Sequence, residues 1–252
     1  MKTDNILKEI DWLKTELSQL RPLPPAAMEK IRQAMDIEYT YDSNRIEGNT
    51  LTLQETALVV NEGVTIGGKS MREHLEAINH NEAIEYIKEI AAQNTLITEN
   101  VIKHIHAIVL HNIDRENAGK YRTVPVMISG SEYLPPQPYL IAPQIEEFIR
   151  NYKEMESKNI HPVLVAAYLH DELVRIHPFI DGNGRTSRLL MNLYLLRKGY
   201  PVVSLKSDND SKARYYKALE KSHVTGNRSE FDEFIVETVH NTLKKYIQII
   251  KG

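Results

Sequence analysis

Cysteine is absent from this sequence of 252 residues. Its absence excludes disulfides, thiolate metal sites and cysteine nucleophiles, and it fits a reducing compartment. Long apolar runs are lacking as well, because no segment approaches the ~18 uninterrupted apolar residues of a membrane-spanning helix. The N-terminus mixes charges throughout and has no apolar core like that of a signal peptide. We therefore expect a cytoplasmic protein with no membrane partner.

A strong net charge is also lacking, since 31 basic residues nearly balance 34 acidic ones. The formal charge of -3 gives no overall field that would concentrate nucleic acid, so we expect no nucleic-acid partner. Any phosphate-binding site must then be a local arrangement of a few residues. The content of 42% hydrophobic and 26% charged residues is that of an ordinary globular protein.

Helical periodicity is what the sequence has in abundance. Apolar residues recur at steps of three and four over 6–20, and Pro22, Pro24 and Pro25 follow this first segment. The capping pairs Thr52/Glu55 and Ser70/Glu73 each predict the start of a helix, and the helix after the second pair should cover about 71–92. Further helices are expected at about 26–47, 101–109, 143–156, 162–175 and 184–198, and two more in the C-terminal region. About ten helices predict an all-α architecture.

One segment, 121–134, has the pattern of strands. Val124, Val126 and Ile128 alternate ahead of a glycine and a proline-rich stretch, which predicts a short β-hairpin. Pro125 cannot donate a ladder hydrogen bond, so this hairpin should lie at an edge. Its outer edge could then receive another chain.

The string HPFIDGNGRTSR, placed between two apolar helices, has the most unusual composition. Gly182, Asn183 and Gly184 can adopt positive φ and point successive amide hydrogens into one concavity that holds an anion. The helix that follows adds its partial positive charge. Arg185 and Arg188 lie on its first turn, where they could hold separate phosphates.

Two further side chains of this string suit phosphate chemistry. Asp181 precedes the glycines, where its hard oxygen could hold a Mg²⁺ shared with the phosphates. His177 could accept a proton from an incoming hydroxyl near neutral pH. Elsewhere the patterns are weak: Ser43 and Glu47 could be a plain helix end, and Tyr215 and Tyr216 could be core residues.

Taken whole, HPFIDGNGRTSR resembles the signature of the Fic family, and SNRIEGN resembles the N-terminal inhibitory helix of one of its subclasses. The resemblance implies a Fic fold, a helical bundle with one β-hairpin flap over the active site. It also implies transfer of AMP from ATP to a Tyr, Thr or Ser hydroxyl of a target protein, with release of pyrophosphate. His177 would be the general base, Asp181 would hold Mg²⁺ or Mn²⁺, and the phosphates would be bound by Gly182, Asn183, Gly184, Arg185 and Arg188.

The same resemblance assigns three other groups of residues. Glu47, supported by Ser43, would pair with Arg188 and hold the enzyme in an inhibited state. The segment 121–134 would be the flap that pairs with the target, through Met127, Ile128, Ser129 and Gly130. Tyr215 and Tyr216 would line the adenine pocket.

The resemblance divides the chain into an N-terminal helical region, 1–95, which contains the inhibitory helix at about 38–48, and a Fic core, 96–252. Self-modification, removal of AMP and a homodimer are all compatible with these residues. The sequence does not identify the target protein or the signal that relieves inhibition.

Two other functions remain open at this stage. His170 and Asp171, with His161 upstream and Asp181 downstream, are compatible with a metal phosphohydrolase of the HD type, although that function leaves the glycines and arginines of the string unused. A non-catalytic module that senses ATP is the other alternative. The remaining histidines, His74, His80, His104, His106 and His111, have no metal-ligand spacing, and we expect surface or core roles for them.

Overall fold

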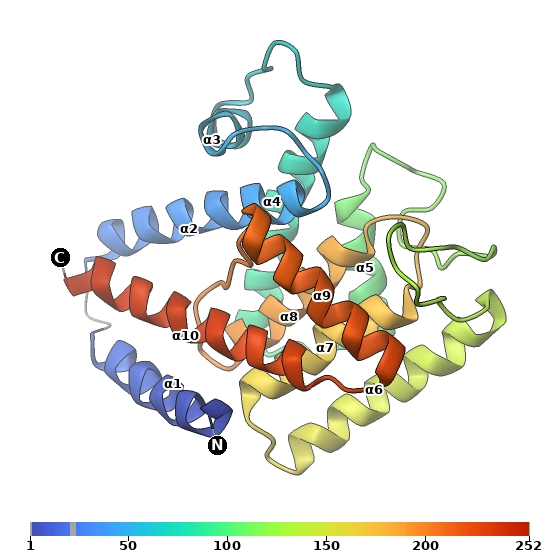
Figure 1. Cartoon of the computed structure of the whole chain (residues 1–252). Coiled ribbons are helices and arrows are strands. Elements are labelled where there is room, and N and C mark those ends of the chain that lie inside the picture. Colours follow the sequence, from blue (N-terminus) through green and yellow to red (C-terminus); the bar gives the residue numbers. More distant parts are fainter. Residues whose placement is uncertain (1, 21–23, 252) are drawn as a thin grey trace.

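The chain is all-α, as the periodicity predicts. A computed structural model describes residues 2–20 and 24–251, and within them it contains ten α-helices, one 3₁₀ helix and no β-strand (Figure 1). The helices are α1 (Lys2–Gln19), α2 (Pro25–Ile46), α3 (Leu53–Glu62), α4 (Met71–Ala92), α5 (Glu99–Val109), η1 (Pro138–Leu140), α6 (Ile141–Ser157), α7 (Pro162–Ile176), α8 (Asn183–Arg197), α9 (Asn209–Thr225) and α10 (Ser229–Lys251). None of the described helices combines the length and the apolar character of a bilayer-spanning segment.

The helix starts follow local capping chemistry. At the start of α3 the Thr52 side chain accepts a bond from the backbone N–H of Glu55 while the Glu55 carboxylate accepts one from the Thr52 N–H, and Ser70 and Glu73 do the same for α4. Both predicted capping boxes are therefore confirmed. Pro22, which we expected to help end the first helix, lies outside the described residues.

The core is built around α8, which is buried on nearly all sides. Of its fifteen residues, twelve are buried, including every residue from Arg185 to Leu195. Burial on nearly all sides is typical of a central helix, although the first half of α8 carries buried polar side chains such as Arg185 and Arg188. Helices α7, α4 and α5 pack against it, and α1 packs along α10 (Figure 1). The start of α8 is thereby enclosed by helices that are distant in sequence.

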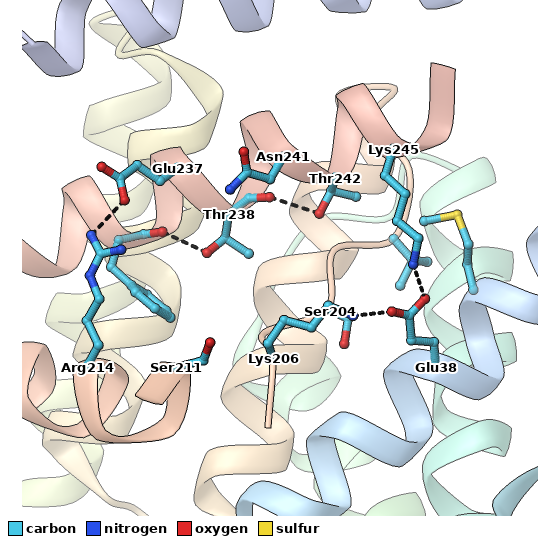
Figure 2. A pocket seen from close by; sticks show the side chains of 13 residues that line it. Glu38, Ser204, Lys206, Ser211, Arg214, Glu237, Thr238, Asn241, Thr242 and Lys245 are labelled. Carbon is cyan, nitrogen blue, oxygen red and sulfur yellow. Dashed lines mark hydrogen bonds and ion pairs between the residues drawn. The ribbon is translucent and has the colours of Figure 1, made fainter. Parts of the chain in front are cut away.

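Helix α2 is fastened to the C-terminal half by ionic contacts near its middle. Glu38 accepts hydrogen bonds from Lys206 and, at 2.6 Å, from Lys245 of α10, as Figure 2 shows. One turn later the Asp42 carboxylate accepts bonds from Ser204 Oγ at 2.9 Å and from Ser207 Oγ at 2.6 Å. Together these contacts fix the C-terminal end of α2 above α8.

The predicted β-hairpin at 121–134 is not formed. The segment is extended and turns at Ser129 and Gly130, but no described residue in it belongs to a strand. Its turn is closed by the N–H of Ser131, which donates to the carbonyl of Ile128 at 3.2 Å. Pro125 and the pair Pro135–Pro136 lack the donors that a ladder would need, which accounts for the missing strands.

Candidate active site

The turn between α7 and α8 is shaped by its own side chains. His177 ends α7 in the left-handed conformation with φ of 48°, and Gly182 takes φ of 76° just before α8. Asn183, the first residue of α8, closes the turn: its Oδ1 accepts a hydrogen bond from the N–H of Phe179, and its Nδ2 donates one to the Phe179 carbonyl, both at 2.9 Å. The Asn183 side chain is thus used inside the turn, and only its backbone is free to face a ligand.

His177 has one ring nitrogen bonded and one available. Its Nδ1 lies 3.3 Å from the Val174 carbonyl oxygen, which can only accept, so Nδ1 carries the proton. The Nε2 atom is then the basic one. Burial lowers the pKa of His177 to about 4, partly opposed by that backbone bond. The imidazole is therefore neutral at pH 7 and able to accept a proton.

Arg188 lies beneath the start of α8 with no exposed surface. Its Nη2 donates to Glu47 Oε1 at 2.6 Å and to the Ser43 carbonyl at 2.9 Å, and its Nε donates to Ser43 Oγ at 2.9 Å. Burial disfavours the charge of Arg188, but Glu47, Tyr215 and Tyr39 together outweigh it and raise the pKa of Arg188. The geometry brings Ser43, Glu47 and Arg188 together, as the resemblance implies.

Gly184 is required by this ion pair. A Cβ atom at Gly184 would collide with the carboxylate of Glu47 and would lie 3.1 Å from Arg188 Nη1. The carboxylate therefore lies against the first turn of α8. The first amides of a helix have no partners within it, so the Glu47 carboxylate lies beside a helix start of the kind that can bind an anion.

Asp181 is engaged by two arginines. Its Oδ1 accepts from the N–H of Gly182 at 2.6 Å and from Arg185 at 3.2 Å, and its Oδ2 accepts from Arg72 of α4 at 2.5 Å. Burial acts to raise the pKa of Asp181, but the Arg185 charge, the Gly182 amide and Arg72 lower it overall. The carboxylate is ionised at neutral pH and is already surrounded by positive charge.

Arg185 is buried and only partly satisfied. Besides Asp181 it contacts Glu76 of α4 at 3.3 Å, while its Nε and Nη1 atoms have no hydrogen-bond partner in the described part of the chain. Glu76 also accepts a bond from Asn49 at 3.0 Å, two residues after Glu47. This acidic residue of α4 thus links the segment that follows α2 to α8.

Sequence reasoning missed His106, which we expected to have only a surface or core role. Its Nε2 donates to the Asp181 carbonyl at 2.9 Å, its Nδ1 accepts from the Gly119 N–H at 2.9 Å, and its ring stacks on Phe179 with centroids 3.6 Å apart. Burial lowers the pKa of His106 to about 4, so it is neutral. His106 holds the turn from outside, and no spacing within its own helix could have shown this.

A cavity of about 720 Å³ opens beside this turn. Its volume is that of a small-molecule site. Its lining residues include Ile46, Glu47, Gly48, Ile128, Ser129, Gly130, Ser131, Val174, His177, Gly184, Lys212, Tyr215, Tyr216, Lys217, Leu219, Glu220 and His223.

Of the expected flap and adenine residues, all but one line this cavity. The exception is Met127, whose side chain is 81% exposed and is not part of the lining. Tyr215 is buried against the aromatic core, and its hydroxyl lies 3.4 Å from Arg188 Nη1. Tyr216 is half exposed and donates from its hydroxyl to the Ile46 carbonyl at 3.0 Å, which ties α9 to the end of α2.

Two residues that the sequence did not suggest hold the flap segment in place. The Glu220 carboxylate of α9 accepts from Ser131 Oγ and, at 2.7 Å, from the N–H of Glu132. Arg122 lies at the base of the segment and donates to carbonyls near both of its ends. Side-chain bonds thus take the place of the expected ladder.

The histidine and aspartate that suggested a phosphohydrolase do not form a metal site. No cluster of three His, Asp or Glu side chains suited to a metal occurs among the described residues. Asp171 is buried and contacts Ser222 at 2.8 Å and His223 at 3.1 Å, while His170 contacts Tyr215. They serve the core between α7 and α9.

Comparison with known proteins agrees with this geometry. Residues 96–195 match the model of the Fic/DOC family. The protein adenylyltransferase Fic of Drosophila persimilis is 36% identical over 241 residues, which cover 96% of this chain and 46% of that protein. The corresponding protein of Drosophila melanogaster is 35% identical over 96% of this chain and 48% of its own length. The chain therefore spans about half the length of these curated relatives.

Solved structures show the same arrangement of helices. Fic-1 from C. elegans superposes with a TM-score of 0.88 at 30% identity, covering 99% of this chain and 73% of that one. A Fic domain containing signaling protein from Bacteroides thetaiotaomicron also has a TM-score of 0.88 at 30% identity, and it covers 97% of each chain. The likeness therefore includes α1 to α4 as well as the region that the family model matches.

Proposed function

Because the chain belongs to the Fic family, we propose that it transfers AMP from ATP to a hydroxyl group of a target protein. One observation carries the proposal: a neutral imidazole, that of His177, faces the same cavity as the first turn of α8 at Gly184. A base and an anion-binding helix start are what attack on a phosphate requires.

The reaction would proceed by attack of the hydroxyl oxygen on the α-phosphorus. His177 Nε2 takes the proton as the new oxygen–phosphorus bond forms. The bond between the α-phosphorus and its bridging oxygen breaks, and pyrophosphate leaves with the electron pair. The amides of Asn183 and Gly184 and the guanidinium of Arg185 neutralise charge on the phosphates, so catalysis is mainly positioning and electrostatic stabilisation.

A Mg²⁺ or Mn²⁺ ion fits the residues at Asp181. The Oδ2 atom of Asp181 already holds a cationic group, that of Arg72, whose side chain is 57% exposed and can move away. A hard carboxylate oxygen suits either ion. When bound, the ion would neutralise phosphate charge, while Arg185 continues to orient the other carboxylate oxygen.

We propose further that Glu47 inhibits the transfer. The carboxylate takes up Arg188, which would otherwise hold the terminal phosphate, and it lies over the first turn of α8. A hydrogen bond between charged groups contributes about 1.5–3 kcal/mol. Removing it should raise AMP transfer on the order of 10- to 100-fold. The same carboxylate could orient a water that removes AMP from a modified target.

The test is incubation of wild type, Glu47→Gly and Glu47→Gly/His177→Ala with labelled ATP and a cell lysate, followed by mass spectrometry of the labelled proteins. We expect weak labelling by wild type, strong labelling by Glu47→Gly and none by the double variant. The modified residues, including any on the chain itself, would identify the hydroxyl type.

Glu62→Gly, which removes an exposed carboxylate at the end of α3, is the matched control and should leave labelling unchanged. Labelling that persists without His177 would exclude it as the base. Nucleotide binding without transfer by any variant would favour a non-catalytic module.

A further inference from the structure

Arg122 is a buried arginine whose partners are backbone carbonyls. It is 3% exposed, and it donates from Nη1 to Val124 at 3.0 Å and from Nη2 to Pro136 at 2.6 Å. The Val124 carbonyl lies on the first limb of the flap segment, and the Pro136 carbonyl lies two residues beyond the end of its second limb. The third donor, Nε, reaches the carbonyl of His177 at 2.8 Å. One side chain therefore joins both ends of the flap to the residue proposed as the base.

The charge of Arg122 is not balanced by a carboxylate. Across residues 2–20 and 24–251, no Asp or Glu forms an ion pair with it, and burial lowers its pKa. Burying an unpaired cation is costly, and a residue kept at such cost is expected to serve a purpose besides packing. The planar guanidinium can donate in several fixed directions at once, which a lysine cannot do.

The contact with His177 falls at a strained point of the backbone. His177 has φ of 48° and ψ of 57°, a conformation that residues with a Cβ rarely adopt. Arg122 bonds to its carbonyl and, through its own backbone N–H, to the carbonyl of Pro178 at 2.9 Å. Two donors from one residue thus fix the peptide planes that determine where the imidazole points.

We propose that Arg122 is a positioning residue that holds His177 and the flap in one fixed relation, so that a hydroxyl lying along the flap meets the imidazole. This inference rests on the proposed function of the site. Misplacement of reacting groups by about 1 Å can reduce a rate on the order of 100-fold. Loss of Arg122 should therefore reduce kcat while ATP, held by α8, keeps its KM.

Arg122 also affects the charge of the imidazole. The groups acting on His177 are Arg122 from the flap, Glu47 from α2 and His223 from α9. After burial and the bond to Val174, the Arg122 charge contributes to the lowered pKa of His177, Glu47 opposes it, and His223 adds to it. Replacing Arg122 by a neutral residue should raise the pKa of His177. Because a lysine at this position would keep the charge, comparing glutamine and lysine variants separates this charge effect from the loss of the hydrogen bonds.

The experiment compares Arg122→Gln and Arg122→Lys in the Glu47→Gly protein, with Arg150→Gln as control because Arg150 is an exposed arginine on α6. Three quantities are measured: the pKa of His177 by NMR titration, hydrogen exchange of the amides between 124 and 134, and kcat and KM for ATP. For Arg122→Gln we expect a higher pKa, at least tenfold faster exchange, kcat lowered at least tenfold and KM for ATP within about threefold.

Arg122→Lys keeps the positive charge but loses the planar guanidinium. The pKa of His177 in this variant should therefore stay near that of the parent, while hydrogen exchange of the flap amides still becomes faster. This variant decides the matter if Arg122→Gln does not fold. The proposal is overturned if the flap amides of both variants exchange as slowly as those of the Glu47→Gly parent, or if kcat falls no more than it does in Arg150→Gln. An inactive Glu47→Gly parent would instead refute the proposed function, while the titration and exchange would still test the positioning.

Discussion

His177, at the start of the turn 177–182, and the tip of the flap 121–134 line one cavity, but the turn and the flap are held in different ways. The turn is closed chiefly by its neighbours in sequence, namely Asn183, the left-handed residues His177 and Gly182, and the helix that follows, while His106 and Arg122 add bonds from outside. The flap contains Pro125, which has no backbone donor, and it depends on the side-chain bonds of Arg122 at its base and of Glu220 of α9.

This difference shows how the two halves of the candidate site acquire their shape. Gly182, with its positive φ, and the bonded Asn183 give the turn most of its shape locally. The flap has few backbone bonds of its own, so side-chain bonds, including those of Glu220 of α9, decide its position. Regions held in this way have lower local stability and open more easily.

The largest effect should come from breaking the turn with Asn183→Leu. This change leaves the N–H and the carbonyl of Phe179 without partners in a buried place. Each unsatisfied group costs about 1–3 kcal/mol, so urea unfolding should show a loss on the order of 2–4 kcal/mol. Asn61→Leu, at an exposed position of α3, should change stability by less than about 0.5 kcal/mol. Equal losses in the two variants would contradict a turn held by Asn183.

An intermediate effect, with a change of sign, is expected for Gly184→Ala. In the wild type the added methyl meets the Glu47 carboxylate and should lower the free energy of unfolding by about 1–3 kcal/mol. In the Glu47→Gly protein that obstacle is gone, and alanine in a helix is favoured by up to about 1 kcal/mol. Thermal unfolding of the four proteins measures this cycle. The same loss in both backgrounds would mean that Glu47 does not lie against Gly184.

The smallest effect on stability should follow Glu220→Ala, which releases the flap tip. Global stability should fall by less than about 1 kcal/mol, because the bonds lost lie at the surface. Hydrogen exchange at the Glu132 amide should nevertheless become at least tenfold faster. Lys221→Ala on the same helix is the control. If the flap exchanged no faster than in the control, the comparison between a locally held turn and a distantly held flap would fail.

The resemblance read from two short strings led to the correct family, because phosphate chemistry requires particular residues at fixed spacing. Helix bounds were also predictable wherever caps are local, as for α3 and α4. The hairpin prediction was wrong because alternation indicates strands only if backbone donors are free to pair. His106, Arg122, Arg72 and Glu220 escaped prediction, since their importance comes from partners far away in the sequence.

The sequence by itself determined the helices, the turn before α8 and the presence of an acidic residue in the SNRIEGN string, since these depend on local propensity and spacing. Only the tertiary structure decided that Glu47 lies on Gly184 and bonds to Arg188, 141 residues later. It also decided that a single arginine joins the flap to His177. Contacts across such separations arise from the packing of α2 and the flap against α8 and α9, and packing is a property of the whole fold.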